Sequence, residues 1–418
     1  MTEKHNTIST IIEAHFNQQI AFLQRLVRTN SVNPLTPETV SPDIPVEQEV
    51  ASVIQQELYR LGFPGELVGV TSQRPNVLCH VSSGDARKTL VLTTHMDTVE
   101  PGEYTRDPWG AQIVERRLYG IGAADAKAQI AAMIYALHAL RHASIHLDGR
   151  VTLAFVVDEE TGACSPYGTQ YLLEHGYLHG DGVIIGEPGN NMIALGHRGL
   201  YRFRLIIFGE ATHTGRRAWE QGKQGRNAIL DMARFIQALS EQSLPVMISP
   251  SFPNRKSVLT FPTLIRGGSG INMVPGSCEA YGDVRLLPGL LAEEVKKLIR
   301  SQLEQLSIEH YQLNDVLVVP AAETDQQAEI VQTLATEVET ITGVRPPLEG
   351  SGPACDGWMF ITRNIPTVCG YGVTCGGVHG ADEWVDLESL KKITEIYAAT
   401  ALRFLGEGPG PKRNEQRC

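Results

Sequence analysis

The spacing of apolar residues predicts a layered α/β domain in the first part of the chain. Residues 10–28 and 46–61 repeat apolar side chains at three- and four-residue steps, which indicates two amphipathic helices. Residues 88–94 and 151–157 are nearly continuous apolar runs, typical of strands that a sheet buries on both faces. The Ala-rich residues 124–140 between these runs predict a crossover helix. Strand, helix and strand in this order indicate an α/β sheet, and we expect it to be doubly wound and mixed.

The pattern changes after Gly199 to one typical of a smaller antiparallel sheet. Residues 201–208 alternate aromatic, basic and apolar side chains, which predicts a half-exposed strand. Four further elements are predicted, in the order helix, strand, strand and helix: residues 226–239, 257–267, 277–285 and 292–306. The whole order is that of a split βαβ sandwich, a ferredoxin-like α+β arrangement.

The chain then returns to the first domain. Residues 328–342 and 387–404 have helical periodicity and follow the smaller domain. We therefore expect one domain built from residues 1–198 and 313–418, into which a second domain, residues 199–312, is inserted. A chain of 418 residues also exceeds one ordinary core, which favours two domains.

Composition and charge argue against several kinds of partner and location. The formal net charge is −11 and the chain has no basic stripe, so we expect no nucleic-acid partner. We also expect no membrane span, because no apolar run approaches roughly 18 residues. We expect no secretory signal, because residues 1–18 are polar and lack a long apolar stretch. Seven cysteines without a CxxC pair favour reduced thiols in a cytoplasmic protein and argue against a cysteine zinc site.

Candidate chemistry begins where the first predicted strand ends. His95 and Asp97 directly follow the apolar run 88–94 and, two residues apart, share a face of an extended backbone. The ligand-binding edge of α/β sheets lies at such strand ends. Asp97 could therefore orient the ring of His95, by holding the nitrogen that does not bind a metal. The alternative is an ordinary surface loop.

Four more sites have the same character, and each has a structural alternative. Asp125 follows a Gly-rich stretch, where it could instead cap a helix. The run of three carboxylates from Asp158 to Glu160 ends the strand 151–157, and such crowding is costly unless a cation balances it or water solvates it. Glu187 follows a short apolar run, and His379 lies in a Gly-rich turn.

Taken together, these residues indicate a metal centre. Two histidines and three or four carboxylates, most of them directly after predicted strands, fall in one domain. This set suits a pair of divalent ions, with one carboxylate bridging them. Mixed His and carboxylate ligands favour two Zn²⁺ per chain, with Co²⁺ or Mn²⁺ as alternatives.

The sequence resembles the metallopeptidase family that includes aminoacylase, carboxypeptidase G, acetylornithine deacetylase and succinyl-diaminopimelate desuccinylase. Six motifs carry the resemblance in the family's order: HMDTV at 95–99, GAADAK at 122–127, DEETG at 158–162, GEP at 186–188, GHRG at 196–199 and HGADE at 379–383. The resemblance implies that residues 196–199 are the hinge into the inserted domain, which acts as a lid and forms the contacts of a homodimer.

The same resemblance assigns roles to the candidate residues. It implies Glu159 as the general base, which takes a proton from water and delivers it to the leaving amine. It implies five metal ligands: Asp125 as the bridge, His95 and Glu187 for one ion, and Glu160 and His379 for the other.

Lid residues and one loop are implied in substrate contact. His213 resembles a lid histidine that stabilises the oxyanion, reaching across to the partner's site in dimers; its alternative is a structural loop histidine. Asn272 and Arg285 resemble lid residues that touch substrate. Arg285 suits a carboxylate, although a salt bridge within the lid sheet would also explain it. Asp356 lies in a substrate-facing loop, and Trp358 stands where desuccinylases of the family tend to have Arg, which argues against succinyl-diaminopimelate.

We therefore expect a metal-dependent amidohydrolase that removes the acyl group from a small N-acyl amino acid, of the deacetylase or aminoacylase type. A di- or tripeptidase or a carboxypeptidase of the same family is the alternative within the enzyme class. A catalytically inactive binding protein on the same fold is the alternative from another class. The acyl group and the amino-acid side chain stay open.

Overall fold

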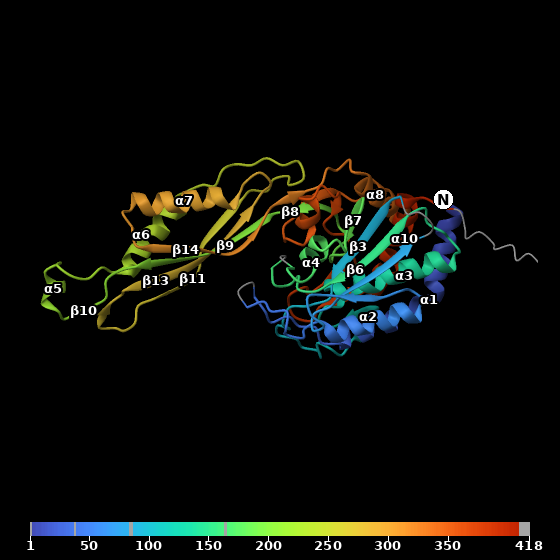
Figure 1. The fold of residues 1–418 in the computed structure, drawn as a ribbon, viewed down its shortest axis with the longest axis horizontal. Coiled ribbons are helices and arrows are strands. Elements are labelled where there is room, and N and C mark those ends of the chain that lie inside the picture. The colour runs from blue at the N-terminus through green and yellow to red at the C-terminus, as the bar shows by residue number, and fades with distance from the viewer. Residues whose placement is uncertain (1, 37–38, 83–86, 163–164, 409–418) are drawn as a thin grey trace, which may run out of the picture. The chain divides into compact units, whose positions relative to one another are not determined.

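The computed structural model describes residues 2–36, 39–82, 87–162 and 165–408. The chain forms two compact units, one made of Met1–His197 with Glu323–Cys418 and the other of Arg198–Ala322 (Figure 1). The division after His197 falls within residues 196–199, where the hinge is expected. Each unit has its own core and is described separately.

A mixed six-stranded sheet is the centre of the larger unit. Four neighbouring strands run parallel, while β2 is antiparallel to both of its neighbours. The strands in spatial order are β1 (Glu66–Val68), β2 (Asn76–Ser82), β6 (Arg150–Val156), β3 (Thr89–His95), β7 (Gly182–Ile185) and β17 (Thr367–Val368). The predicted mixed α/β sheet is therefore confirmed.

Helices cover both faces of this sheet, so its parallel strands are buried on both sides. Alternate residues of β3 show this, because Leu90 and Leu92 pack into one apolar cluster and Val91 into another. The first cluster holds α1 (Thr2–Arg28), α2 (Gln48–Arg60), α3 (Ala128–His142), α8 (Glu329–Thr342) and α10 (Leu387–Leu405) (Figure 1). The second holds α4 (Thr169–Glu174) and α9 (Gly357–Ile361).

The smaller unit is an antiparallel four-stranded sheet with two helices. The strands in spatial order are β11 (Val258–Gly267), β13 (Ser277–Leu286), β9 (Gly199–Phe208) and β14 (Tyr311–Val319). Helices α6 (Ala228–Ser240) and α7 (Ala292–Gln305) share a core with the sheet, built around Phe203, Phe235 and Ile299. The expected boundary at residue 312 lies inside β14. Because β14 pairs with β9, the unit continues to Ala322.

Short elements complete the two units. They are β4 (Gln112–Val114), β5 (Arg117–Tyr119), the π-helical turn η1 (Ala123–Lys127), β8 (Ile193–His197), β10 (Thr212–His213), α5 (Arg217–Glu220), β12 (Met273–Val274), β15 (Ala322–Glu323), β16 (Leu348–Ser351), β18 (Cys375–Gly376) and β19 (Trp384–Asp386).

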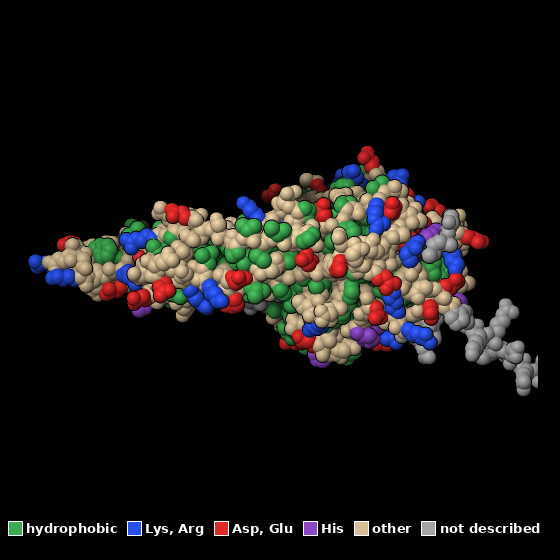
Figure 2. Space-filling model, turned by 90° about the horizontal axis from the view of Figure 1, so that it is seen from above, with side chains coloured by type: hydrophobic (Ala, Val, Ile, Leu, Met, Phe, Trp, Pro, Cys, Tyr) green, Lys and Arg blue, Asp and Glu red, His purple; other side chains and the backbone are tan. Residues whose placement is uncertain are grey.

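The surface carries charges of both signs, and the described cysteines form no disulfides. Basic and acidic side chains are interspersed on the face that Figure 2 presents. Within the described ranges, no helix has the length and apolar character needed to cross a bilayer. Five cysteines are free thiols, namely Cys79, Cys278, Cys355, Cys369 and Cys375. The other two, Cys164 and Cys418, lie outside the described residues.

Candidate metal centre

Three neighbouring parallel strands deliver the first part of the site. His95 is the last residue of β3, Glu160 follows the end of β6, and Glu187 comes two residues after β7. Because β6, β3 and β7 are adjacent and parallel, their carboxyl ends meet at one edge of the sheet. This is the edge at which α/β sheets bind ligands.

Asp125 reaches the same place from the turn before α3. The predicted helix 124–140 differs here, because Asp125 and Ala126 have non-helical backbone angles within η1 and the regular helix begins at Ala128. The carboxylate of Glu383 accepts backbone N–H bonds from Gly122 (3.0 Å), Ala124 (2.7 Å) and Asp125 (2.9 Å). These three hydrogen bonds therefore hold the turn in a non-helical conformation at Asp125.

Two groups of potential ligand atoms share Asp125. In one group, atoms of His95, Asp125 and Glu187 lie within 4.8 Å of one another, and in the other the same holds for Asp125, Glu160 and His379. Oδ1 of Asp125 lies 3.0 Å from Nε2 of His95, and Oδ2 lies 3.1 Å from Nε2 of His379. Each carboxylate oxygen thus faces a different group, which is the arrangement of a bridging ligand. The donor set fits two divalent ions.

The electrostatics of this edge favour a cation. Loss of hydration and the nearby charges of Glu187 and Asp356 raise the pKa of Glu159 well above its ordinary value, although His95 opposes the shift. Burial, together with Asp125, raises the pKa of Glu187 to about 8. Burial also raises the pKa of Asp356 to about 7, against the hydrogen bond from Thr169. Carboxylates that resist ionisation because of burial and of one another are stabilised by positive charge between them.

Asp97 organises the site differently from the expectation. Nδ1 of His95 lies 2.9 Å from the backbone carbonyl oxygen of Asp97, closer than the 3.5 Å to its carboxylate. The carboxylate instead accepts N–H bonds from Glu159 (3.2 Å) and Glu160 (3.1 Å), and from the side-chain amide of Asn33 (2.8 Å). Asp97 therefore holds the ring through its backbone and the acidic loop through its side chain.

A buried arginine balances Asp158, the first carboxylate of the acidic run. Arg74 is fully buried, donates to Glu47 and lies 3.2 Å from Asp158. Burial raises the pKa of Asp158 to about 6, and the charge of Arg74 opposes that rise. Asp158 is thus tied to the scaffold, whereas Glu159 and Glu160 face the centre.

The remaining predicted residues divide between the units. Asp356 belongs to the larger unit, is buried, and accepts a 2.5 Å hydrogen bond from Thr169. In the smaller unit, the amide of Asn272 lies 3.2 Å from Nε2 of the exposed His213. Arg285 donates to Asp283 at 2.8 Å, so the salt-bridge alternative describes its contact in this structure.

Sequence reasoning missed Glu383, Asn33 and Arg74 as parts of the site. Glu383 ends the motif 379–383, so its position beside a ligand was a usable signal. Asn33 and Arg74 lie far from the motifs along the chain, and nothing in their local sequence marks them.

Two groups of ligand atoms around one shared carboxylate, at the carboxyl edge of a mixed sheet, define a metallohydrolase by class. Residues 91–403 match the model of peptidase family M20/M25/M40, which is well over half of the chain. The chain belongs to this family, and the resemblance read from the motifs is confirmed.

Two relatives by sequence agree with this assignment. The chain is 30% identical to the succinyl-diaminopimelate desuccinylase of Methylorubrum extorquens, with 90% of this chain and 96% of that protein covered. It is 27% identical to the acetylornithine deacetylase of Proteus mirabilis, with 90% and 94% covered.

Solved structures share the fold at lower identity. Aminopeptidase PepT from Bacillus cereus superposes with a TM-score of 0.72 at 20% identity, covering 93% of this chain and 98% of that one. The YXEP protein of Bacillus subtilis, described as a dinuclear metal-binding peptidase, gives 0.69 at 17%, covering 94% and 99%.

Replacing Glu383 tests whether its three backbone contacts shape the centre. In Glu383→Gln one carboxylate oxygen becomes an amide group, which cannot accept an N–H bond, so the turn carrying Asp125 loosens. We expect the affinity for Zn²⁺ to fall by about 10- to 100-fold, the usual effect of removing a partner behind a metal ligand. Competition with a chromophoric chelator measures it. The exposed Glu103→Gln is the control, and equal affinity in both variants would contradict the role given to Glu383.

Proposed function

We propose that this chain is a di-zinc amidohydrolase that removes the acyl group from a small N-acyl amino acid. The observation that carries the proposal is Asp125, whose two oxygens face two separate groups of ligand atoms beside Glu159. Membership of the M20/M25/M40 family supports it. The two-ion count draws support from the YXEP protein, which is described as dinuclear.

We assign a separate role to each residue of the site. Asp125 bridges the ions, His95 and Glu187 complete one site, and Glu160 and His379 complete the other. When bound, such a pair of ions lowers the pKa of water and polarises the scissile carbonyl. The carboxylate of Asp97 holds the backbone of Glu159, and its backbone carbonyl orients the ring of His95.

Glu159 serves as the general base. It adjoins the ligand Glu160 but belongs to neither group of ligand atoms, so its carboxylate is free to exchange a proton. It takes a proton from the attacking water and delivers it to the leaving amine. The surroundings that raise its pKa favour the protonated form that the second step needs.

The substrate class follows from the relatives and from charge. A desuccinylase and a deacetylase of acylated amino acids cover nearly the whole chain. We propose that Arg285, released from Asp283, grips a substrate carboxylate, with Asn272 and Asp356 as further contacts. Trp358 argues for an acyl amino acid other than succinyl-diaminopimelate.

A peptidase is the second candidate, because the fold also matches aminopeptidase PepT. A screen of N-acyl amino acids beside di- and tripeptides, with Zn²⁺ or Co²⁺ added, separates the two. Faster turnover of peptides than of N-acyl amino acids would replace the deacylase proposal.

We propose the cytoplasm as the location, in line with the free thiols of the described cysteines.

The smaller unit is proposed as a ferredoxin-like lid that also forms a homodimer. Its sheet has β11 at one edge, and Leu264 and Ile265 on that strand are exposed. An edge strand with exposed apolar side chains favours pairing with a second copy. His213 is exposed on the same unit, so its side chain is available to act at the metal centre of a partner chain.

Removing the bridge tests the paired centre. Asp125→Ala deletes a ligand of both ions, so its zinc content should be lower than that of the unaltered chain by about two equivalents. Elemental analysis after zinc loading and gel filtration measures the difference. A difference of one equivalent would contradict the pair, and no difference would contradict the centre itself.

Glu159→Gln tests the general base. The variant should keep its zinc, because Glu159 belongs to neither group of ligand atoms, while kcat falls by at least about 100-fold. Glu160→Gln is the matched comparison, since the loss of a ligand should lower the zinc content as well. Near-normal turnover of zinc-loaded Glu159→Gln would place the base elsewhere.

Mixing two inactive variants tests whether His213 acts across the dimer. If equal amounts of His213→Ala and Glu159→Gln chains pair at random, half of the dimers are mixed and each has one intact site. Activity should then return to about a quarter of the normal value. If His213 serves its own chain, every site carries a defect and no activity returns. A strictly monomeric enzyme by light scattering would also exclude action across a dimer.

A further inference from the structure

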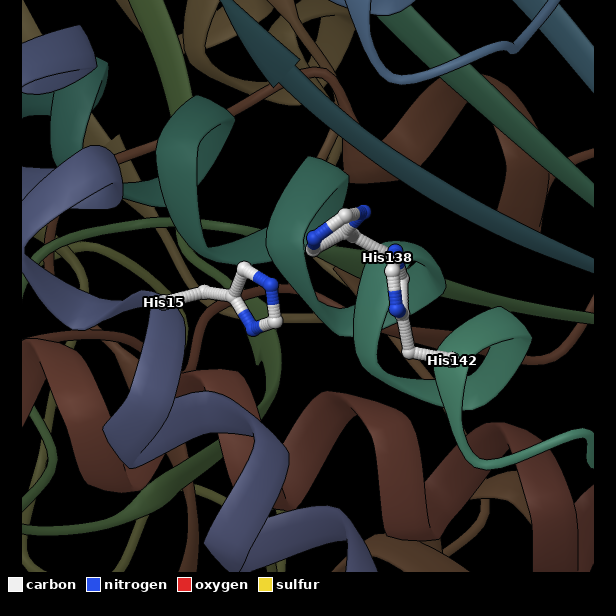
Figure 3. A group of neighbouring side chains, drawn as sticks. All are labelled: His15, His138 and His142. Carbon is white, nitrogen blue, oxygen red and sulfur yellow. The ribbon is translucent and has the colours of Figure 1, made fainter.

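Three histidines outside the metal centre converge between two helices of the larger unit. His15 projects from α1, and His138 and His142 project from α3 (Figure 3). Each offers one ring nitrogen, and these three atoms lie within 4.8 Å of one another. The ring centroids are 4.3 Å apart for His138 and His142, and 4.7 and 5.0 Å from His15 to these two.

The helices place these rings by simple geometry. His138 and His142 are four residues apart, so they lie one above the other on the same face of α3. Two histidines at this spacing on a helix are a recurring zinc-binding pair. Helix α1 packs against α3 in the same apolar cluster and brings His15 from the other side as a third donor.

His138 is the observation that points to a ligand. The residue is 5% exposed, and neither of its ring nitrogens has a hydrogen-bond partner among the described residues. A buried polar group without a partner is costly, and most such groups in proteins are satisfied. An ion bound by one nitrogen would remove this cost.

His15 is already oriented as a metal ligand. Its Nδ1 lies 2.9 Å from the backbone carbonyl oxygen of Ile11, so Nδ1–H donates to that oxygen. The proton is thereby held on Nδ1, and Nε2 keeps its lone pair free for coordination. Metal-binding histidines are commonly fixed in this way by a bond from their other nitrogen.

The charge state of His138 suits coordination as well. Burial, together with the neighbouring rings of His142 and His15, lowers the pKa of His138 to about 4. The ring is therefore neutral at neutral pH, as a metal ligand must be. Three imidazoles without a carboxylate suit Zn²⁺, Cu²⁺ or Ni²⁺ and are poor ligands for Mg²⁺ or Ca²⁺.

We infer that His15, His138 and His142 form a third metal site that binds one Zn²⁺ or a similar divalent transition ion. The site is separate from the Asp125 centre, because His138 lies ten residue steps along α3 from Ala128, a rise of about 15 Å. Its ligands come from two helices, so the ion joins α1 to α3. The site does not depend on the proposed reaction.

Zinc content in matched variants tests this site. The chain is stripped with a chelator, reloaded with Zn²⁺ and freed of excess ion by gel filtration. His142 is exposed at the end of α3, so His142→Gln removes a ligand without disturbing the core. The control is His175→Gln, which changes another exposed histidine at a helix end.

His142→Gln should hold about one equivalent of zinc less than the unaltered chain, while His175→Gln holds the same amount. Equal zinc in all three proteins overturns the site. His15→Gln should lose the same equivalent, and its retention there would overturn the assignment of three ligands from two helices.

Two further measurements separate this site from the catalytic proposal. In an Asp125→Ala background the loss caused by His142→Gln should persist, whatever number of ions the Asp125 centre holds. A loss that disappears in this background would overturn the independence of the site.

Hydrogen exchange of the α1 amides should be at least about tenfold slower in the zinc-loaded chain than in zinc-loaded His142→Gln. Equal exchange would overturn the claim that the ion joins the two helices.

Discussion

Negative charge gathered at one edge of a buried sheet is the constraint on which the larger unit depends. Strands β3, β6 and β7 end beside one another, and the residues that follow them bring Glu160 and Glu187 near Asp125, with Glu159 near Glu187. Burial raises the pKa of the three glutamates, and the neighbouring carboxylates add to the rise. The fold therefore favours a state in which cations lie between them, and the two groups of ligand atoms around Asp125 provide the places.

The loops that carry these ligands are fixed by buried hydrogen bonds and ion pairs. Glu383 holds the turn that presents Asp125, and Asp97 holds the backbone of Glu159 and Glu160. Arg74 keeps Asp158 out of the centre by pairing with it. A site built in this way is set before any ion binds, because the supporting groups belong to the scaffold. Pre-organisation of this kind is what a catalytic centre needs.

Much of this arrangement could be predicted from the sequence because strand ends can be recognised locally. The apolar runs before His95 and Asp158 predict buried parallel strands, and parallel strands bring their carboxyl ends together. The path of the chain at Asp125 could not be predicted in this way. The Ala-rich pattern favours a helix from residue 124, but a carboxylate more than 250 residues away holds the turn open.

The same limit applies to other features that depend on distant contacts. The sequence predicts an end of the smaller unit at residue 312, whereas the unit continues to Ala322, because the pairing of β14 with β9 has no local signal. His138 and His142 form a recognisable helical pair, yet their meeting with His15 depends on how α1 packs on α3. Residue type and spacing thus predict which groups are available, and tertiary packing decides which of them meet.

Anomalous diffraction at the zinc edge, from crystals of the zinc-loaded chain, tests the central claim most directly. The account predicts two peaks about 3.5 Å apart on either side of the Asp125 carboxylate. One of these peaks should lie beside His95 and Glu187, and the other beside Glu160 and His379. A single peak at Asp125, or none, would contradict it.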